Sequence, residues 1–346
     1  MTRSSVSSSV VFDLVVVGAG PCGLAAAISA QHVGMRVRVI DAGSVVSTIA
    51  AYPYYANFFS TAEKLALGNV PFVTAGDKPT RRDALAYYRA IVKHFALDVR
   101  QNERVTRLER GSDVWTIHSH APDGTPRETL ARNVVVATGY FGSPNYLKVK
   151  GEDLPHVRHV YREGHEGFQQ PVVVVGGGNS AAEAALDLWR AGARVTLVHF
   201  GPTFDKRIKP WVLPDFENRA REFAIATRWN SRVVSIEPGV VLVRGPEGEE
   251  DIAARFVYVM TGFAPNTELL RDAGVPIDAL TGIPQHNPET LETPLEGLFI
   301  AGVVVAGFDA NKVFIENGRF HGDKIVAHLR GEPAPPPPQL SAELDT

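Results

Sequence analysis

Two glycine-rich turns, each set between an apolar strand and a helix, constrain this chain more than any other feature. The first turn, Gly18-Ala19-Gly20-Pro21-Cys22-Gly23, follows an apolar run at 12–17. An alanine-rich helix then continues to about Gln31, and a strand at 37–40 ends beside Asp41.

The second half of the chain repeats this order. A strand at 172–175 leads into Gly176-Gly177-Gly178-Asn179-Ser180-Ala181, and a helix to about Trp189 and a strand at 195–198 lead to His199. The interval from Gly18 to Asp41 equals that from Gly176 to His199, 23 positions. Shared context and spacing indicate an internal repeat, and alternating strands and helices predict parallel sheets.

The first turn has the chemistry of a dinucleotide site. Gly18 permits the tight turn, Gly20 lets the backbone approach a pyrophosphate, and Gly23 lets helix and strand pack closely. The helix N-terminus offers N–H donors and partial positive charge to the phosphates. Asp41 stands where a carboxylate accepts hydrogen bonds from ribose hydroxyls. We assign FAD to this site because a later segment, 293–303, returns to this half of the chain.

After that segment the sequence predicts a helix from Asn311 to His328. Its N-terminus, at Asn311, Lys312 and Val313, would face the flavin pyrimidine and stabilise the anionic reduced form.

The second turn differs in the residue that would meet the ribose. His199 replaces the acid there, and Lys206, Arg207 and Lys209 follow it. A histidine does not repel a 2′-phosphate as a carboxylate would, and the cations can pair with that phosphate. This pattern favours NADPH over NADH.

Each half also ends on a strand that runs into Thr-Gly. One reaches Ala137-Thr138-Gly139 and the other Thr261-Gly262, so both strand ends would lie near the bound nucleotides. We predict an α/β fold with two Rossmann-like domains: 10–153 with 269–332 for FAD, and 154–268 for NADPH. Residues 1–9 and 333–346 are expected to be flexible tails.

The composition limits the possible functions. The chain has 346 residues, 45% hydrophobic and 21% charged, with a formal net charge of −3. This charge argues against non-specific binding to nucleic acid or anionic membranes. No apolar run approaches the ~20 residues of a membrane span, and the first residues lack the parts of a signal peptide. We therefore expect a soluble cytoplasmic homo-oligomer, a dimer or higher, that acts on a small molecule.

The sequence resembles the low-molecular-weight thioredoxin reductase superfamily over about 11–330. The resemblance lies in the two Rossmann-type halves, the Ala137-Thr138-Gly139 junction and the return at 297–302. Those enzymes carry a Cys-x-x-Cys pair in the NADPH domain, whereas Cys22 is the only cysteine here. Ordinary thioredoxin reductase chemistry is therefore excluded.

Four departures resemble one branch, the bacillithiol disulfide reductase family. They are Cys22 inside the first glycine loop and the runs 58–61, 208–214 and 309–322. Val303 also stands where thioredoxin reductases carry an Asp. This resemblance implies an NADPH-dependent flavoenzyme of redox homeostasis that reduces oxidised bacillithiol or a related low-molecular-weight disulfide.

Cys22 has two interpretations. As a redox relay it would form a mixed disulfide with the substrate, helped by a pKa lowered at the helix N-terminus. As a packing residue it would only fit beside FAD, whose pyrophosphate opposes a second anion. The sequence leaves both open.

Three other functions also stay open: a flavin monooxygenase, a ferredoxin or flavodoxin NADP reductase of the same fold, and a non-enzymatic redox sensor.

The histidines show no metal-ligand spacing, so no metal is predicted. The predicted catalytic residue is Cys22. The predicted cofactor contacts are Gly18, Gly20, Pro21, Cys22, Gly23, Asp41, Val105, Ala137, Thr138, Gly139, Gly302, Val303, Asn311, Lys312 and Val313 for FAD, and Gly176, Gly178, Asn179, Ser180, Ala181, His199, Lys206, Arg207, Lys209, Thr261 and Gly262 for NADPH.

Overall fold

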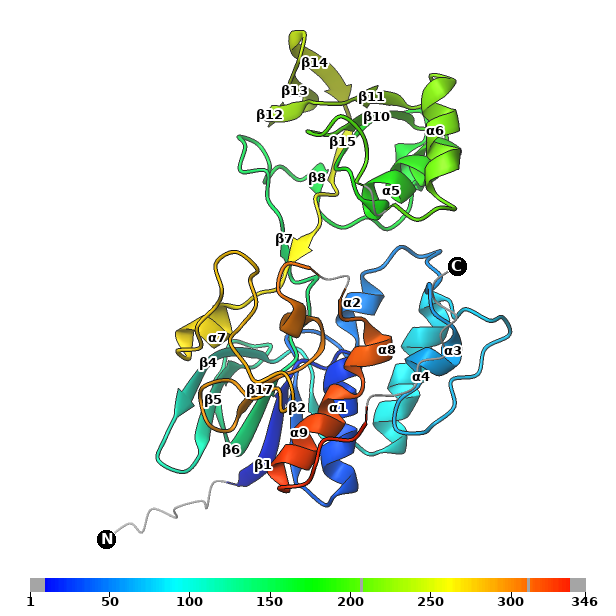
Figure 1. The fold of residues 1–346 in the computed structure, drawn as a ribbon. Helices are drawn as coiled ribbons and strands as arrows, with labels where there is room; N and C mark the ends of the chain where they lie inside the picture. The colour runs from blue at the N-terminus through cyan, green and yellow to red at the C-terminus, as the bar shows by residue number, and fades with distance from the viewer. Residues whose placement is uncertain (1–9, 206–207, 310–311, 337–346) are drawn as a thin grey trace. The chain divides into compact units, whose positions relative to one another are not determined.

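The computed structural model describes residues 10–205, 208–309 and 312–336 (Figure 1). The chain divides into two compact units. Unit 1 contains the chain up to Ala50, Asn57–Gly142 and the residues from Pro265 on. Unit 2 contains Ala51–Ala56 and Ser143–Ala264.

Unit 1 is built on a mainly parallel sheet with strand order β3-β2-β1-β6-β5-β4, in which β17 also pairs with β6. Its strands are β1 (Val11–Val17), β2 (Val37–Ile40), β3 (Val99–Arg100), β4 (Arg104–Arg110), β5 (Trp115–His120), β6 (Pro126–Val136) and β17 (Leu298–Ile300). Its helices are α1 (Pro21–His32), α2 (Ser47–Ala50), α3 (Ala62–Leu65), α4 (Arg81–His94), α7 (Glu268–Asp272), α8 (Ile315–Gly318) and α9 (His321–Leu329).

Strand β6 joins the parallel and antiparallel parts of this sheet. Its first half pairs antiparallel with β5, and its last residues pair in parallel with β17. Along its other edge it pairs in parallel with β1. The segment that the sequence predicted to return to the first glycine loop therefore adds a strand beside β6, close to that loop.

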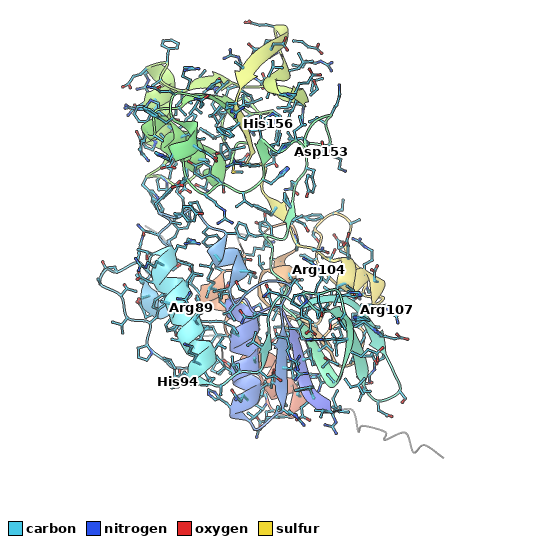
Figure 2. The ribbon with its side chains drawn as sticks, turned by 180° about the vertical axis from the view of Figure 1, so that it is seen from behind. Arg89, His94, Arg104, Arg107, Asp153 and His156 are labelled. Atoms are coloured by element: carbon cyan, nitrogen blue, oxygen red, sulfur yellow. The ribbon has the colours of Figure 1, made fainter. Side chains whose placement is uncertain are left out.

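Amphipathic patterning decides which faces of the outer elements are buried. Helix α4 begins with a capping box formed by Thr80 and Asp83, and it buries Tyr88 while Arg89 and His94 stay exposed. Strand β4 buries Leu108 and exposes Arg104 and Arg107 (Figure 2).

The sequence predicted one helix over 311–328, and this prediction is wrong in the described residues, which form α8 and α9 instead. The side chain of Asn317 explains why α8 begins later than the predicted helix. Its Oδ1 accepts a hydrogen bond from the Phe314 N–H at 2.8 Å, and its Nδ2 donates to the Lys312 carbonyl at 2.9 Å. These side-chain bonds compete with helical backbone bonds at the first residues. A turn after α8 then lets Gly322 of α9 pack against Ala26 of α1, where a β-carbon would stand 2.4 Å from the Ala26 Cα.

Unit 2 contains a parallel sheet of order β11-β10-β9-β15-β8 and an antiparallel sheet of order β12-β13-β14. Its strands are β7 (Ser143–Pro144), β8 (Val157–Arg158), β9 (Pro171–Val175), β10 (Arg194–Val198), β11 (Ala226–Arg228), β12 (Arg232–Glu237), β13 (Gly239–Gly245), β14 (Gly248–Ala254), β15 (Phe256–Val259) and β16 (Phe263–Ala264). Its helices are α5 (Asn179–Arg190) and α6 (Leu213–Arg221).

The alternation of side chains along β9 divides the core of unit 2 into two layers. Val172 and Val174 pack with α5 and α6, whereas Val173 and Val175 pack with the antiparallel sheet. Such a parallel sheet, buried on both faces, is the architecture of Rossmann-like domains. The predicted α/β fold with two Rossmann-like sheets is thereby confirmed.

Candidate functional site

The predicted contact residues gather at the carboxyl ends of the parallel strands, where α/β sheets bind their ligands. In unit 1, strands β1, β2, β6 and β17 run into Gly18, Asp41, Ala137 and Gly302. In unit 2, strands β9, β10 and β15 run into Gly176, His199 and Thr261. Each unit therefore presents one candidate nucleotide site.

The neighbouring backbone requires glycine at the first position of each loop. Gly18 has a φ of +115°, and a β-carbon on it would stand 2.3 Å from the carbonyl oxygen of Ala137. Gly176 has a φ of +149°, and its β-carbon would stand 2.3 Å from the carbonyl oxygen of Met260. Only glycine combines this conformation with so close an approach. The two loops thus share one geometry.

The N-cap glycines, in contrast, border open space. Among the described atoms, a β-carbon on Gly20 would meet nothing within 4 Å, and one on Gly178 would meet only Asp205 Oδ2, at 4.0 Å. In the ranges that the structure describes, no side chain caps α1 or α5, each 12 residues long. Their first-turn N–H groups and helix dipoles can therefore receive an anion. Both loops fit the pyrophosphate of a dinucleotide.

Asp41 is held beside the first loop by two backbone donors. Its Oδ2 accepts from the Ala19 N–H at 2.6 Å, and its Oδ1 accepts from the Gly43 N–H at 2.7 Å. The carboxylate thus lies next to the loop, where the sequence predicts contact with the ribose hydroxyls of FAD. Each carboxylate oxygen can accept more than one hydrogen bond, so these bonds leave capacity for a ribose.

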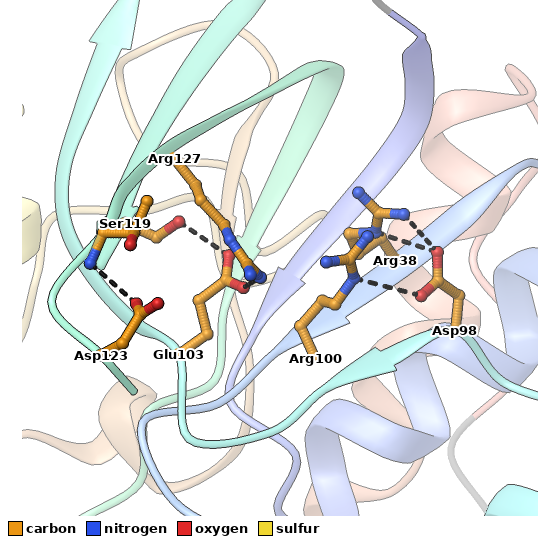
Figure 3. Close-up of polar contacts among 8 residues, drawn as sticks. Arg38, Asp98, Arg100, Glu103, Ser119, Asp123 and Arg127 are labelled. Carbon is orange, nitrogen blue, oxygen red and sulfur yellow. Dashed lines mark hydrogen bonds and ion pairs between the residues drawn. The ribbon is translucent and has the colours of Figure 1, made fainter. Parts of the chain in front are cut away.

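A buried carboxylate, that of Glu103, supports the region around Asp41 (Figure 3). Glu103 is 2% exposed, and its carboxylate accepts from Ser119 Oγ and from Arg127 Nη1, each at 2.7 Å. The Glu103 N–H donates to the Asp41 carbonyl at 2.9 Å. Sequence reasoning missed this group, because its members come from β5, β6 and the residue before β4 and share no motif.

The side chain of Cys22 faces the returning C-terminal segment. A β-carbon on Gly302 would stand 3.3 Å from its Sγ, and one on Gly318 would stand 2.7 Å away. Burial raises the pKa of the thiol to about 12, and Glu316 acts in the same direction. The expected lowering of this pKa is therefore wrong, because desolvation disfavours the thiolate more than the helix N-terminus favours it.

His321 also contacts Gly302. Its Nδ1 accepts a hydrogen bond from the Gly302 N–H at 3.1 Å. Burial lowers the pKa of His321 to about 4, with smaller contributions from Lys324 and His286. A neutral imidazole therefore fixes the backbone at the end of β17.

The other predicted FAD contacts differ in their surroundings. Val105 is half-buried against the core of unit 1, and Thr138 is exposed. Lys312 is exposed, whereas Val313 Cγ1 would stand 3.2 Å from a β-carbon on Gly318. Asn311 lies outside the described residues.

His199 covers the glycine loop of unit 2. It is 4% exposed, and a β-carbon on Gly177 would stand 2.1 Å from its Cε1. Its Nδ1 is buried and has no hydrogen-bond partner among the described residues. Burial lowers the pKa of His199, Asp205 opposes this shift, and Arg232 adds to it. A buried ring nitrogen without a partner at this position fits a nucleotide that would supply one.

The remaining contacts predicted for the second site lie around α5. The Asn179 Oδ1 accepts from the Lys209 N–H at 2.8 Å, which ties the loop before α6 to the start of α5. Thr261 Oγ1 donates to the Asn145 carbonyl. Lys206 and Arg207, predicted to pair with a 2′-phosphate, lie outside the described residues.

The part of the chain that the structure describes lacks two further features. It contains no cluster of three or more His, Cys, Asp or Glu side chains arranged to hold a metal ion. None of its helices has the length and apolarity that a membrane crossing requires.

Comparisons with known proteins agree with this geometry. A family model described as pyridine nucleotide-disulphide oxidoreductase matches residues 15–302. The chain is 44% identical over 318 residues to bacilliredoxin reductase Bdr of Bacillus subtilis (strain 168), which covers 91% of this chain and 96% of that protein. The structure of bacillithiol disulfide reductase Bdr from Bacillus cereus has a TM-score of 0.90 and 42% identity, covering 92% of this chain and 99% of that one. The corresponding Staphylococcus aureus structure has a TM-score of 0.87 and 39% identity, with coverage of 92% and 98%.

Proposed function

Because this chain belongs to the bacillithiol disulfide reductases within the pyridine nucleotide-disulphide oxidoreductase family, we propose that it reduces a low-molecular-weight disulfide with NADPH. Oxidised bacillithiol is the first substrate to test, since relatives covering nearly the whole chain are described as bacillithiol disulfide reductases. The observation that carries the proposal is the pair of glycine loops combined with a single cysteine in the whole chain.

Family membership confirms the prediction of an oxidoreductase that uses FAD and NADPH. The assignment of each cofactor to a site is part of the proposal. We place FAD in the domain of 10–153 and 269–332, because Asp41 and the β17 return lie beside the Gly18 loop. We place NADPH in the domain of 154–268, because His199 covers the Gly177 loop without an acid at that position.

When bound, FAD supplies a two-electron carrier between NADPH and a disulfide. The residues of this chain bind and orient the two cofactors. The N-termini of α1 and α5 receive the pyrophosphates, and Asp41 accepts hydrogen bonds from a ribose. His321 holds the Gly302 N–H in place, so the end of β17 keeps a fixed position beside Cys22.

The role of Cys22 stays a prediction. A relay must attack the substrate as a thiolate, whereas burial keeps this thiol protonated near neutral pH. Its close contacts with Gly302 and Gly318 favour the packing role. A homo-oligomeric state and a cytoplasmic location are also parts of the proposal.

The experiment is steady-state NADPH oxidation by the purified FAD-bound protein, with separate acceptors. Oxidised bacillithiol, other low-molecular-weight disulfides, ferredoxin and oxygen are compared at equal concentration. We expect a disulfide to give the highest kcat/KM. Faster turnover of ferredoxin, or stoichiometric hydrogen peroxide from oxygen, would instead support one of the two alternative enzymes.

Stopped-flow absorbance of the flavin separates the two roles of Cys22 in the same system. Cys22→Ala should accept electrons from NADPH in either case. If Cys22 only packs, reoxidation by the disulfide should slow a few-fold at most. A loss of orders of magnitude would establish the relay.

A further inference from the structure

Backbone hydrogen bonds connect the loop after β11 to the residues that follow β10. The His199 N–H donates to the Arg228 carbonyl at 2.9 Å, and the Ser231 N–H donates to the His199 carbonyl at 2.9 Å. The Asn230 N–H donates to the Gly201 carbonyl at 2.8 Å. These bonds fix the start of β12, at Arg232, relative to the candidate ribose position at His199.

The side chain of Arg232 lies over the aromatic ring next to His199. Its Cζ is 4.8 Å from the centroid of the Phe200 ring, and the ring centroids of Phe200 and His199 are 4.5 Å apart. Phe200 is 60% exposed, so this stack lies at the surface of unit 2. Stacking orients the plane of a guanidinium while leaving its N–H groups available.

Neighbouring arginines differ from Arg232 in their partners. Arg228 pairs with Glu250, and Arg244 donates to Glu249. No carboxylate pairs with Arg232 in the ranges that the structure describes. An oriented guanidinium without a carboxylate, beside the buried and unpartnered Nδ1 of His199, is suited to an anionic ligand.

We propose that Arg232 reads the 2′-phosphate of NADPH and so determines the coenzyme preference. This inference rests on the proposed function, and it adds a residue that the sequence did not single out. The phosphate would lie against the guanidinium group of Arg232, and the ribose against His199. The guanidinium suits this role because its N–H groups match phosphate oxygens.

A matched pair of nucleotides isolates the 2′-phosphate without turnover. Adenosine 2′,5′-bisphosphate carries that phosphate, and adenosine 5′-monophosphate lacks it. Binding of each is measured by calorimetry to the FAD-bound protein and to Arg232→Met, which keeps an apolar stem over Phe200. Arg190→Met is the control, because it removes the same charge from a guanidinium already paired with Asp215, at the last turn of α5.

Loss of a charge-assisted contact should weaken bisphosphate binding to Arg232→Met by about tenfold or more. Monophosphate binding should change by less than about twofold, as should both ligands with the control. Equal weakening of both ligands, or no weakening, would overturn the role of Arg232. If the parent protein does not prefer the bisphosphate, the NADPH preference in the proposed function fails as well. If the parent prefers it and Arg232→Met keeps that preference, only Arg232 is excluded.

Discussion

A β-carbon added to Gly318 would stand 2.7 Å from Sγ of Cys22, closer than non-bonded atoms tolerate. Gly318→Ala should therefore lower the stability of the FAD-bound protein by about 1–3 kcal/mol, as overpacking does in other cores. Cys22→Ala in the same protein should recover much of the loss, because it removes the sulfur. Thermal unfolding of the parent, both single variants and the double variant measures this coupling. Strictly additive effects would show that the two residues do not press on each other.

The raised pKa of Cys22 predicts that its thiol reacts slowly with alkylating agents. With a pKa of about 12, the thiolate is a minor species at pH 8. Alkylation by iodoacetamide in the native protein should be roughly a thousandfold slower than after unfolding in urea. The native rate should rise about tenfold per pH unit from pH 7 to 10 without levelling. A native rate within tenfold of the unfolded one would contradict the burial argument.

The lowered pKa of His321 predicts a loss of stability in acid. Between pH 6.5 and about 4 the unfolded chain binds a proton that the folded chain excludes. The stabilisation is complete above pH 6.5 and is lost as the pH falls toward 4, a difference of about 2–3 kcal/mol. His321→Gln should show a shallower loss of melting temperature between pH 7 and 5. His94→Gln, on the exposed face of α4, is the control and should follow the parent.

Removal of Arg127 should weaken FAD binding indirectly, through Glu103 and the backbone at Asp41. Arg127→Ala leaves the buried Glu103 carboxylate with fewer partners, which should cost about 2 kcal/mol. Since Glu103 also bonds the backbone at Asp41, we expect faster loss of FAD, followed by flavin fluorescence. Arg107→Ala breaks an exposed pair with Glu109 and should change neither quantity. Equal FAD release from both variants would mean that the pair of Glu103 and Arg127 does not support the site.

Local patterns predicted the repeated elements well. The two strand-turn-helix units could be recognised because glycine spacing and apolar runs are properties of a short segment. Strands β1 and β2 and helix α1 lie within one or two residues of their predicted positions. The sequence placed the start of this C-terminal helical region too early, because the side chain of Asn317, rather than backbone propensity, decides where α8 begins.

Contacts between distant segments could not be predicted in the same way. Glu103 meets Arg127 only once β4, β5 and β6 are aligned, and Arg232 reaches Phe200 only through the loop after β11. The pKa of Cys22 was misjudged for the same reason. The helix N-terminus is visible in the sequence, whereas the packing of Gly302 and Gly318 around the sulfur is not.

The pairing of β17 with β6 also has a consequence for synthesis. All of Ser143–Ala264 lies between these two strands in the sequence, so it leaves the ribosome before β17 does. Until β17 arrives, the apolar edge of β6 at 134–136 lacks a partner and can pair with another chain. A nascent or truncated protein ending before Leu298 therefore carries an aggregation-prone edge, which completion of the chain removes.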